Sequence, residues 1–140
     1  MTLNFIRMKY RHINILILLL LVNSLVLFAT DFPEWLVPDD AKEVTNPLDD
    51  TKKIIDQGEV LFKTQCVACH GAGAKGDGVI PSANLTSKKF LDQTDGEIHY
   101  KIVNGRGVMP AFKALPDNDV WKIIYYIRSL TGVTENTNLK

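Results

Sequence analysis

The chain contains only two cysteines among its 140 residues, and both stand in one short motif. A zinc site would need two further ligands at structural spacing, but His12 lies near the N-terminus and His99 stands alone. The chain also lacks a strong excess of either positive or negative charge. After residue 30 there are thirteen basic and sixteen acidic residues, a net charge of −3. That imbalance is too mild to indicate nucleic acid or an anionic membrane surface as a partner.

The two cysteines form the most informative motif of the chain, Cys66-Val67-Ala68-Cys69-His70. Two thiols three residues apart can form thioethers with the two vinyl groups of one porphyrin, and the adjacent His70 can bind its iron. The spacing therefore predicts one covalently attached haem c. A redox dithiol or two buried cysteines are the alternatives, although a thioredoxin-like dithiol would need a βαβ context that the flanking sequence does not supply.

Residues 1–29 are predicted to be a targeting segment. Arg7, Lys9 and Arg11 precede an apolar run over residues 13–29, which three polar residues interrupt. This run is at the low end of what spans a bilayer, and its basic flank orients the N-terminus toward the cytoplasm. We expect either a cleaved signal peptide or an N-terminal membrane anchor, with the remainder exported to the periplasm.

Residues 30–50 contain three prolines and no helical or strand period, so an extended arm is expected. Trp35, Leu36 and Val37 would be costly to leave in water, which favours packing of the arm against the domain. A solvated spacer is the alternative. One small domain is expected over residues 51–133.

The first helix of this domain is predicted over residues 51–66, with Asp49 or Asp50 as its N-cap. Apolar residues recur there at i, i+3, i+4 and i+7 and make one apolar face. Gly58 in the middle costs about 1 kcal/mol relative to alanine. We therefore expect another helix to approach closely at Gly58. Beyond the domain, residues 134–140 form a C-terminal tail.

Two further helices are predicted after a loop over residues 71–93, which is rich in glycine and lysine. Thr94 and Glu97 match a capping box, which opens a short helix that ends at Gly105 as an αL cap. The last helix is predicted over residues 117–130, with one stripe of isoleucine and valine. No strand pattern is present, so the predicted fold class is all-α.

Met109 is the only methionine after the targeting segment, because Met1 and Met8 lie within it. It stands in a loop between two predicted helices, where Gly107 lets the backbone come close to a porphyrin and Pro110 stiffens the chain. A methionine in a loop is ordinarily a gap-filler of the core. The haem motif upstream favours Met109 as the second axial ligand.

His99 is the rival ligand, but its apolar neighbours on the short helix favour a surface or half-buried histidine. With His70 and Met109 both bound to iron, neither axial position stays open. This arrangement argues for electron transfer and against an enzyme that binds its substrate at iron.

The order of these features closely resembles the class I monohaem cytochromes c over roughly residues 51–131. The motifs that carry the resemblance are Cys66-Val67-Ala68-Cys69-His70-Gly71, Gly73-Ala74-Lys75-Gly76-Asp77-Gly78, Asp95-Gly96-Glu97 and Gly105-Arg106-Gly107-Val108-Met109-Pro110-Ala111-Phe112. The resemblance implies a small all-α cytochrome c fold, three main helices plus loops around one covalently bound haem. It also implies that the first and last helices cross at Gly58, near Tyr126 or Ile127.

The same resemblance implies a loop carbonyl that holds the Nδ1 proton of His70. In the family this carbonyl often belongs to a proline, which makes Pro81 the candidate here, with Ser82 at the position that the spacing to Leu85 indicates. Leu85 itself is implied to pack against the haem.

The expected function is a one-electron carrier in a respiratory or periplasmic chain. The alternative is a haem c subunit fixed within a larger oxidoreductase complex. The expected partners are redox proteins such as an oxidase, a reductase or a dehydrogenase, with a possible membrane tether through residues 13–29. Four lysines flank the haem-binding loops, and they form either a docking patch or an ordinary solvated surface. They are Lys75, Lys88, Lys89 and Lys113.

Overall fold

The computed structural model describes residues 34–132, so the predicted targeting segment and the C-terminal tail lie outside the described residues. Residues 37–132 belong to one compact unit, and residues 34–36 belong to another. In chain order the helices are α2 (Asp39–Lys42), α3 (Lys52–Gln65), α4 (Val67–His70), α5 (Lys88–Leu91), α6 (Asp95–Asn104) and α7 (Asp117–Ser129). Across residues 34–132 there is no strand, and the all-α prediction is confirmed.

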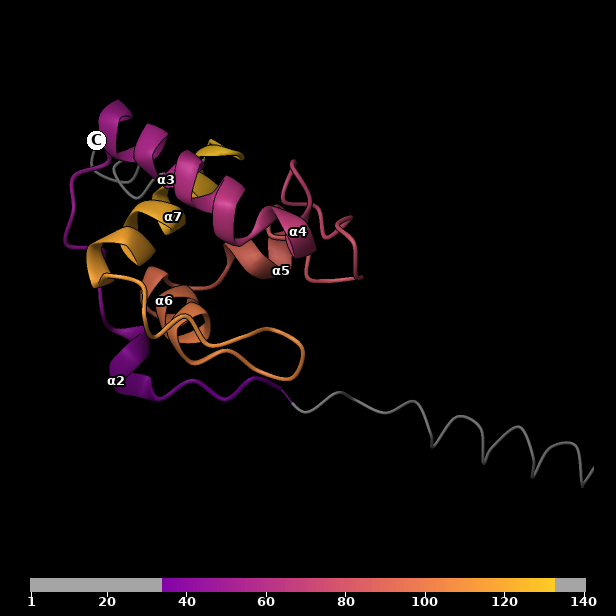
Figure 1. Ribbon diagram of the computed structural model, residues 1–140. Helices are drawn as coiled ribbons and strands as arrows, with labels where there is room; N and C mark the ends of the chain where they lie inside the picture. The colour runs from indigo at the N-terminus through magenta and orange to yellow at the C-terminus, as the bar shows by residue number, and fades with distance from the viewer. Residues whose placement is uncertain (1–33, 133–140) are drawn as a thin grey trace, which may run out of the picture. The chain divides into compact units, whose positions relative to one another are not determined.

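The two longest helices of residues 34–132, α3 and α7, cross at Gly58 (Figure 1). A Cβ atom at this position would lie 2.0 Å from the carbonyl oxygen of Lys122 and 3.0 Å from the Cβ of Tyr126. The close approach explains why a glycine stands in the middle of α3. The predicted crossing near Tyr126 is confirmed, although the closest atom belongs to the backbone of Lys122, one turn earlier in α7.

The N-cap of α3 is Thr51, so the prediction of Asp49 or Asp50 is wrong. The Thr51 hydroxyl oxygen accepts a hydrogen bond from the amide of Ile54 at 3.4 Å. Thr51 is the last residue with extended backbone angles before the first helical turn, and a cap must stand at that point.

The capping box predicted for α6 is present. The Thr94 hydroxyl oxygen accepts a hydrogen bond from the Glu97 amide at 3.2 Å, and the Thr94 amide donates to the Glu97 carboxylate at 2.8 Å. Gly105 follows the last residue of α6 with φ +59 but an extended ψ, so it ends the helix without full αL geometry. A Cβ at Gly105 would lie 2.5 Å from the backbone of Pro110, which brings the end of α6 against the loop that carries Met109.

The core lies between α3, α6 and α7. The predicted stripe of α7 is buried, and Trp121 and Tyr125 beside it are buried as well. Phe62 on α3 is fully buried, and its ring lies 5.3 Å from the ring of Tyr126 across the helix crossing. The largest fully buried side chains are Phe62, Val120, Ile123, Ile124 and Asp95.

Residues 37–50 lie against α6 and α7. The Thr94 hydroxyl donates to the Lys42 carbonyl at 2.8 Å, and the Tyr125 hydroxyl donates to the Leu48 carbonyl at 2.6 Å. The segment is not wholly extended as predicted, because it contains the single turn α2. Pro38 sets the backbone at the start of this turn, and Asp39 and Lys42 form an ion pair of 2.8 Å along it.

Another short helix, α5, lies within the segment that the sequence predicted to be loop. The Ser87 side chain caps it by accepting from the Phe90 amide at 3.4 Å, and Lys88 and Asp92 form an ion pair of 2.6 Å over one turn. Four residues are too few to show a helical period. No helix within residues 34–132 has the length and apolar character needed to cross a membrane.

Candidate haem-binding site

Cys66, Cys69 and His70 lie on one helical turn directly after α3. Cys66 both ends α3 and begins α4, with φ −118 and ψ −32. At positions i, i+3 and i+4 the three side chains share one face of this turn. Both thiols are free and half-buried, and the Cys66 side chain packs against the hydrophobic core. The local helix therefore aims two thiols and an imidazole in one direction.

The environment of the Cys66 thiol is apolar. Burial, together with the charge of the neighbouring Cys69, raises the pKa of the Cys66 thiol to about 12. A protonated thiol is a poor nucleophile in disulfide exchange. Among residues 34–132, no three His, Cys, Asp or Glu side chains gather where they could hold a metal ion.

His70 is held by two oxygen atoms from the loop that follows it. Its Nδ1 lies 3.0 Å from the carbonyl oxygen of Ala83 and 3.3 Å from the Oγ of Ser82. The Ser82 hydroxyl donates its own proton to the Cys69 carbonyl at 2.7 Å, so toward Nδ1 both oxygens act as acceptors. Nδ1 therefore carries the proton, and the lone pair of Nε2 is directed away and is available to a metal.

The carbonyl that meets His70 belongs to Ala83, and the prediction of Pro81 in this role is wrong. The loop turns back at Gly76 with φ +80, where a Cβ would lie only 2.2 Å from the carbonyl oxygen of Ser82. This turn brings residues 82 and 83 against the imidazole, while Pro81 is exposed. Ser82, which the spacing indicated, takes part through its hydroxyl.

Leu85 anchors the end of this loop in the core. Its side chain is buried, and its amide donates to the carbonyl of Ala74 at 2.8 Å. Cys66 and Met109 pack against the same hydrophobic cluster as Leu85. One apolar cluster thus connects the attachment motif, the loop after it and the methionine loop.

Met109 lies in a tight turn after α6. The amide of Arg106 donates to the carbonyl of Met109 at 2.9 Å, and the amide of Met109 donates back to Arg106 at 3.0 Å. Gly107 within the turn has φ +59, a conformation that favours glycine. The amide of Phe112 donates to the carbonyl of Ile102 at 3.1 Å and ties the loop back to α6. The half-buried Met109 is therefore held at a fixed place, as its framing by Gly107 and Pro110 predicted.

His99 is engaged elsewhere. Its Nε2 lies 2.7 Å from the Oδ1 of Asp117, and its ring stacks on Trp121 with 4.1 Å between the ring centroids. Trp121 donates from its indole nitrogen to the other oxygen of Asp117 at 2.8 Å. His99 joins α6 to the start of α7, and it is half-buried, as the prediction of a surface or half-buried histidine expected.

Comparison with known proteins agrees with this arrangement. The family model described as "Cytochrome C oxidase, cbb3-type, subunit III" matches residues 54–127, which span most of α3, the attachment motif, the methionine loop and most of α7. The chain belongs to this family of cytochromes c. As a member of this family it binds covalent haem c.

Two kinds of relative match this cytochrome c. A cbb3-type cytochrome c oxidase subunit FixP from Bradyrhizobium sp. strain ORS 278 is 41% identical over 78 residues, covering 54% of this chain and 27% of the relative. A cytochrome c6 from Bumilleriopsis filiformis is 34% identical over 80 residues, covering 54% of this chain and 90% of the relative. The chain thus matches nearly the whole of a cytochrome c6 but about a quarter of FixP.

One solved structure extends the comparison to three dimensions. The Kuenenia stuttgartiensis reducing HAO-like protein complex contains a chain with a TM-score of 0.54 and 27% identity to this cytochrome c. The match covers 60% of this chain and 46% of that one. This cytochrome c and the matched chain are therefore similar in both fold and sequence.

The side chains of the site suit haem c chemically. Two free thiols can form thioethers, the imidazole of His70 has its proton fixed at Nδ1, and the Met109 thioether is held in a braced loop. Sequence reasoning missed the Ala83 carbonyl and the helix α5. A cap signal for α5 was present, since Ser87 directly precedes Lys88 and Asp92 follows four residues later.

Proposed function

We propose that this cytochrome c transfers single electrons through one haem c that Cys66 and Cys69 attach and that His70 and Met109 ligate. The observation that carries the proposal is the double hydrogen bond at His70 Nδ1, because it fixes the tautomer in which Nε2 can bind iron. The two acceptors, the Ala83 carbonyl and the Ser82 hydroxyl, lie on the loop that turns back at Gly76, and this placement is what a metal-binding histidine requires.

When bound, the haem supplies a reversible one-electron couple at iron, and the chain sets how that couple behaves. His70 presents a neutral imidazole, and Met109 presents a neutral thioether that favours the ferrous state and raises the potential. Leu85 and the apolar cluster around it keep water from the pocket, which disfavours the extra charge of the ferric state in the same direction. With both axial positions filled, no site remains at iron for a substrate.

The chain organisation that we propose follows the sequence. Residues 1–29 serve as a signal peptide or as an N-terminal anchor, residues 30–50 form the arm and residues 51–133 form the haem domain, with 134–140 as a tail. Basic residues before the apolar run favour export, with the haem domain in the periplasm. Cytochrome c maturation in an oxidising compartment also requires machinery that keeps Cys66 and Cys69 reduced.

Two modes of action are consistent with the family. In the first, the protein is a mobile or tethered carrier between a reductase or dehydrogenase and an oxidase, as its coverage of cytochrome c6 favours. In the second, it is a haem subunit fixed in an oxidoreductase complex, as the names of the FixP relatives favour. Lys75, Lys89 and Lys113 are exposed and could steer an acidic partner toward the haem edge.

Two experiments test this proposal. Spectroelectrochemistry of the purified holoprotein should give a single reversible one-electron wave at a potential typical of His/Met ligation, and a wave typical of two nitrogen ligands would contradict it. Sedimentation of the native membrane extract then separates the two modes. A carrier sediments alone or with membrane, whereas a subunit sediments together with an enzyme complex.

A further inference from the structure

Arg128 on α7 reaches three groups that lie between the end of α5 and the beginning of α6. Its Nε donates to the Oδ1 of Asp95 at 2.9 Å, Nη1 donates to the Leu91 carbonyl at 3.0 Å, and Nη2 donates to the Gln93 carbonyl at 2.5 Å. Both charged side chains are buried, with 7% of Arg128 and 1% of Asp95 exposed. The planar guanidinium spreads its donors over three nitrogens in a rigid fork, a geometry that the single ammonium nitrogen of a lysine does not reproduce.

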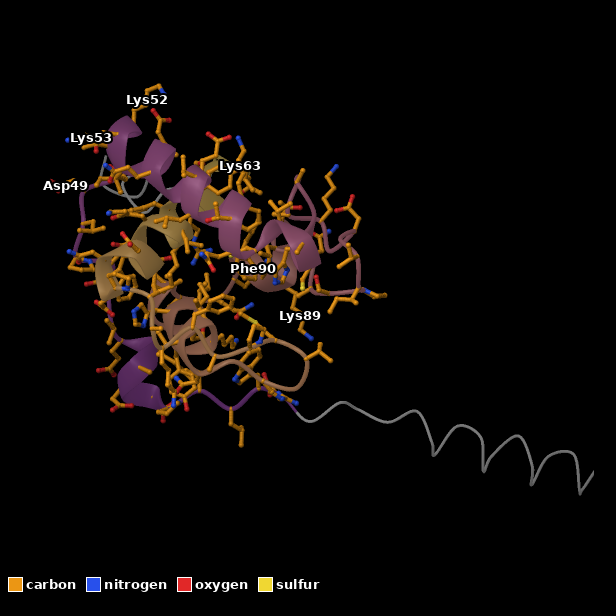
Figure 2. The ribbon with its side chains drawn as sticks, in the orientation of Figure 1. Asp49, Lys52, Lys53, Lys63, Lys89 and Phe90 are labelled. Carbon is orange, nitrogen blue, oxygen red and sulfur yellow. The ribbon has the colours of Figure 1, made fainter. Side chains whose placement is uncertain are left out.

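The segment that Arg128 holds has little packing of its own. None of the four residues of α5 is fully buried, and its Phe90 is half-buried against the hydrophobic core. Figure 2 shows Phe90 on α5, turned toward the interior of the molecule. Gln93 lies just after α5, and its side chain accepts a hydrogen bond from the Lys101 ammonium on α6. The position of α5 therefore depends on polar contacts made at its C-terminal end.

Phe90 packs against the hydrophobic core that the haem-binding residues Cys66 and Met109 also contact. Leu85, which belongs to this core, lies five residues before Phe90 in the chain. If Phe90 moved away from this core, water would enter the haem pocket. Water favours the ferric state because it solvates the extra charge. The place of Phe90 should thus affect the potential.

We propose that Arg128 is a positioning residue of the haem site: through the carbonyls of Leu91 and Gln93 it holds α5, and with it Phe90, against the pocket. This inference rests on the proposed function, because it concerns the haem that His70 and Met109 ligate. The Asp95 carboxylate compensates the charge of the buried guanidinium, so the pair has no net charge. Its second oxygen, Oδ2, has no hydrogen-bond partner among residues 34–132, so Asp95 depends on Arg128 for its charge compensation.

The test compares holoproteins with changes at Arg128 and Asp95. Arg128→Met should lower the midpoint potential and speed hydrogen exchange at the amides of Leu91 and Asp92, which close α5. This single change also leaves the Asp95 charge unpaired, and that charge alone would lower the potential. Asp95→Asn combined with Arg128→Met removes both charges, so a lower potential and faster exchange in the double variant must come from the lost hold on α5.

The matched control is Lys122→Met, which breaks the ion pair of 2.8 Å with Asp119 on the same helix and should leave the potential and the exchange of α5 unchanged. Should Arg128→Met yield no folded protein, Arg128→Lys keeps the charge but loses the three-acceptor fork, and it should lower the potential by less. Phe90→Ala should lower the potential with Arg128 intact.

Wild-type potential and wild-type exchange of α5 in the double variant would overturn the inference and leave the proposed function standing. A wild-type protein without a His/Met spectrum would instead overturn the proposed function. The exchange measurement on α5 distinguishes these failures, because it reports the hold on that helix whatever ligates the iron.

Discussion

Gly58 on α3 lies so close to Lys122 on α7 that a Cβ atom there would stand 2.0 Å from the Lys122 carbonyl oxygen. No side chain fits without moving one helix, because the obstructing atoms are backbone. Gly58→Ala gains helix propensity of about 1 kcal/mol but forces the crossing apart. Overpacking of this kind costs about 1–3 kcal/mol or more, so we expect a net loss in the free energy of unfolding.

Denaturant unfolding of the holoprotein measures this loss. Gly73→Ala is the matched control, since the nearest atom to a Cβ there is the flexible Lys75 side chain at 3.8 Å. Its effect should stay within about 0.5 kcal/mol. Equal stability of the Gly58 and Gly73 variants would mean that the crossing is looser than the backbone distance indicates.

The features that the sequence could predict are local ones. Thr94 and Glu97 could be recognised as a capping box because both partners lie within one turn. The burial of α7 could be predicted because its apolar stripe repeats over three turns. In both cases a local pattern carries the whole signal.

The groups that the sequence did not reveal are joined across long stretches of chain. The acceptor at His70 is a backbone carbonyl, and every residue has one, so only the course of the loop selects Ala83. Arg128 and Asp95 are 33 residues apart, and nothing near either residue indicates the other. Such contacts are decided by tertiary packing.

Cys66→Ser or Cys69→Ser should abolish stable holoprotein, because serine cannot form a thioether and the porphyrin is part of the core. Haem staining after denaturing electrophoresis and the haem-to-protein ratio measure the effect. The wild type should give one haem per chain. Ala68→Ser, on the same turn but exposed, should keep covalent haem and serves as the control. Normal yields of red protein from the Cys66, Cys69 double variant would contradict covalent attachment.

Ser82→Ala should raise the midpoint potential modestly. The Ser82 hydroxyl accepts from His70 Nδ1, which gives the imidazole more anionic character and favours ferric iron. Its removal weakens that effect while the stronger Ala83 hydrogen bond of 3.0 Å remains. Potentiometry measures the shift, and Thr64→Ala, which removes a hydroxyl bonded only within α3, should show none. A lower potential in Ser82→Ala would mean that the Ser82 hydroxyl does not accept a hydrogen bond from His70 Nδ1.

Met109→His should keep six-coordinate haem, remove the weak far-red charge-transfer band of a sulfur ligand and lower the potential substantially, because two nitrogen ligands favour the ferric state. Met109→Ala should leave an open site that binds carbon monoxide readily. The exposed neighbour Val108 supplies the control, since Val108→Ala changes the same loop without changing the ligand.

Retention of the band and the potential by Met109→Ala would place the sixth ligand elsewhere. His99 would then have to leave Asp117 and Trp121 to reach the iron, and His99→Ala would be the variant that decides it.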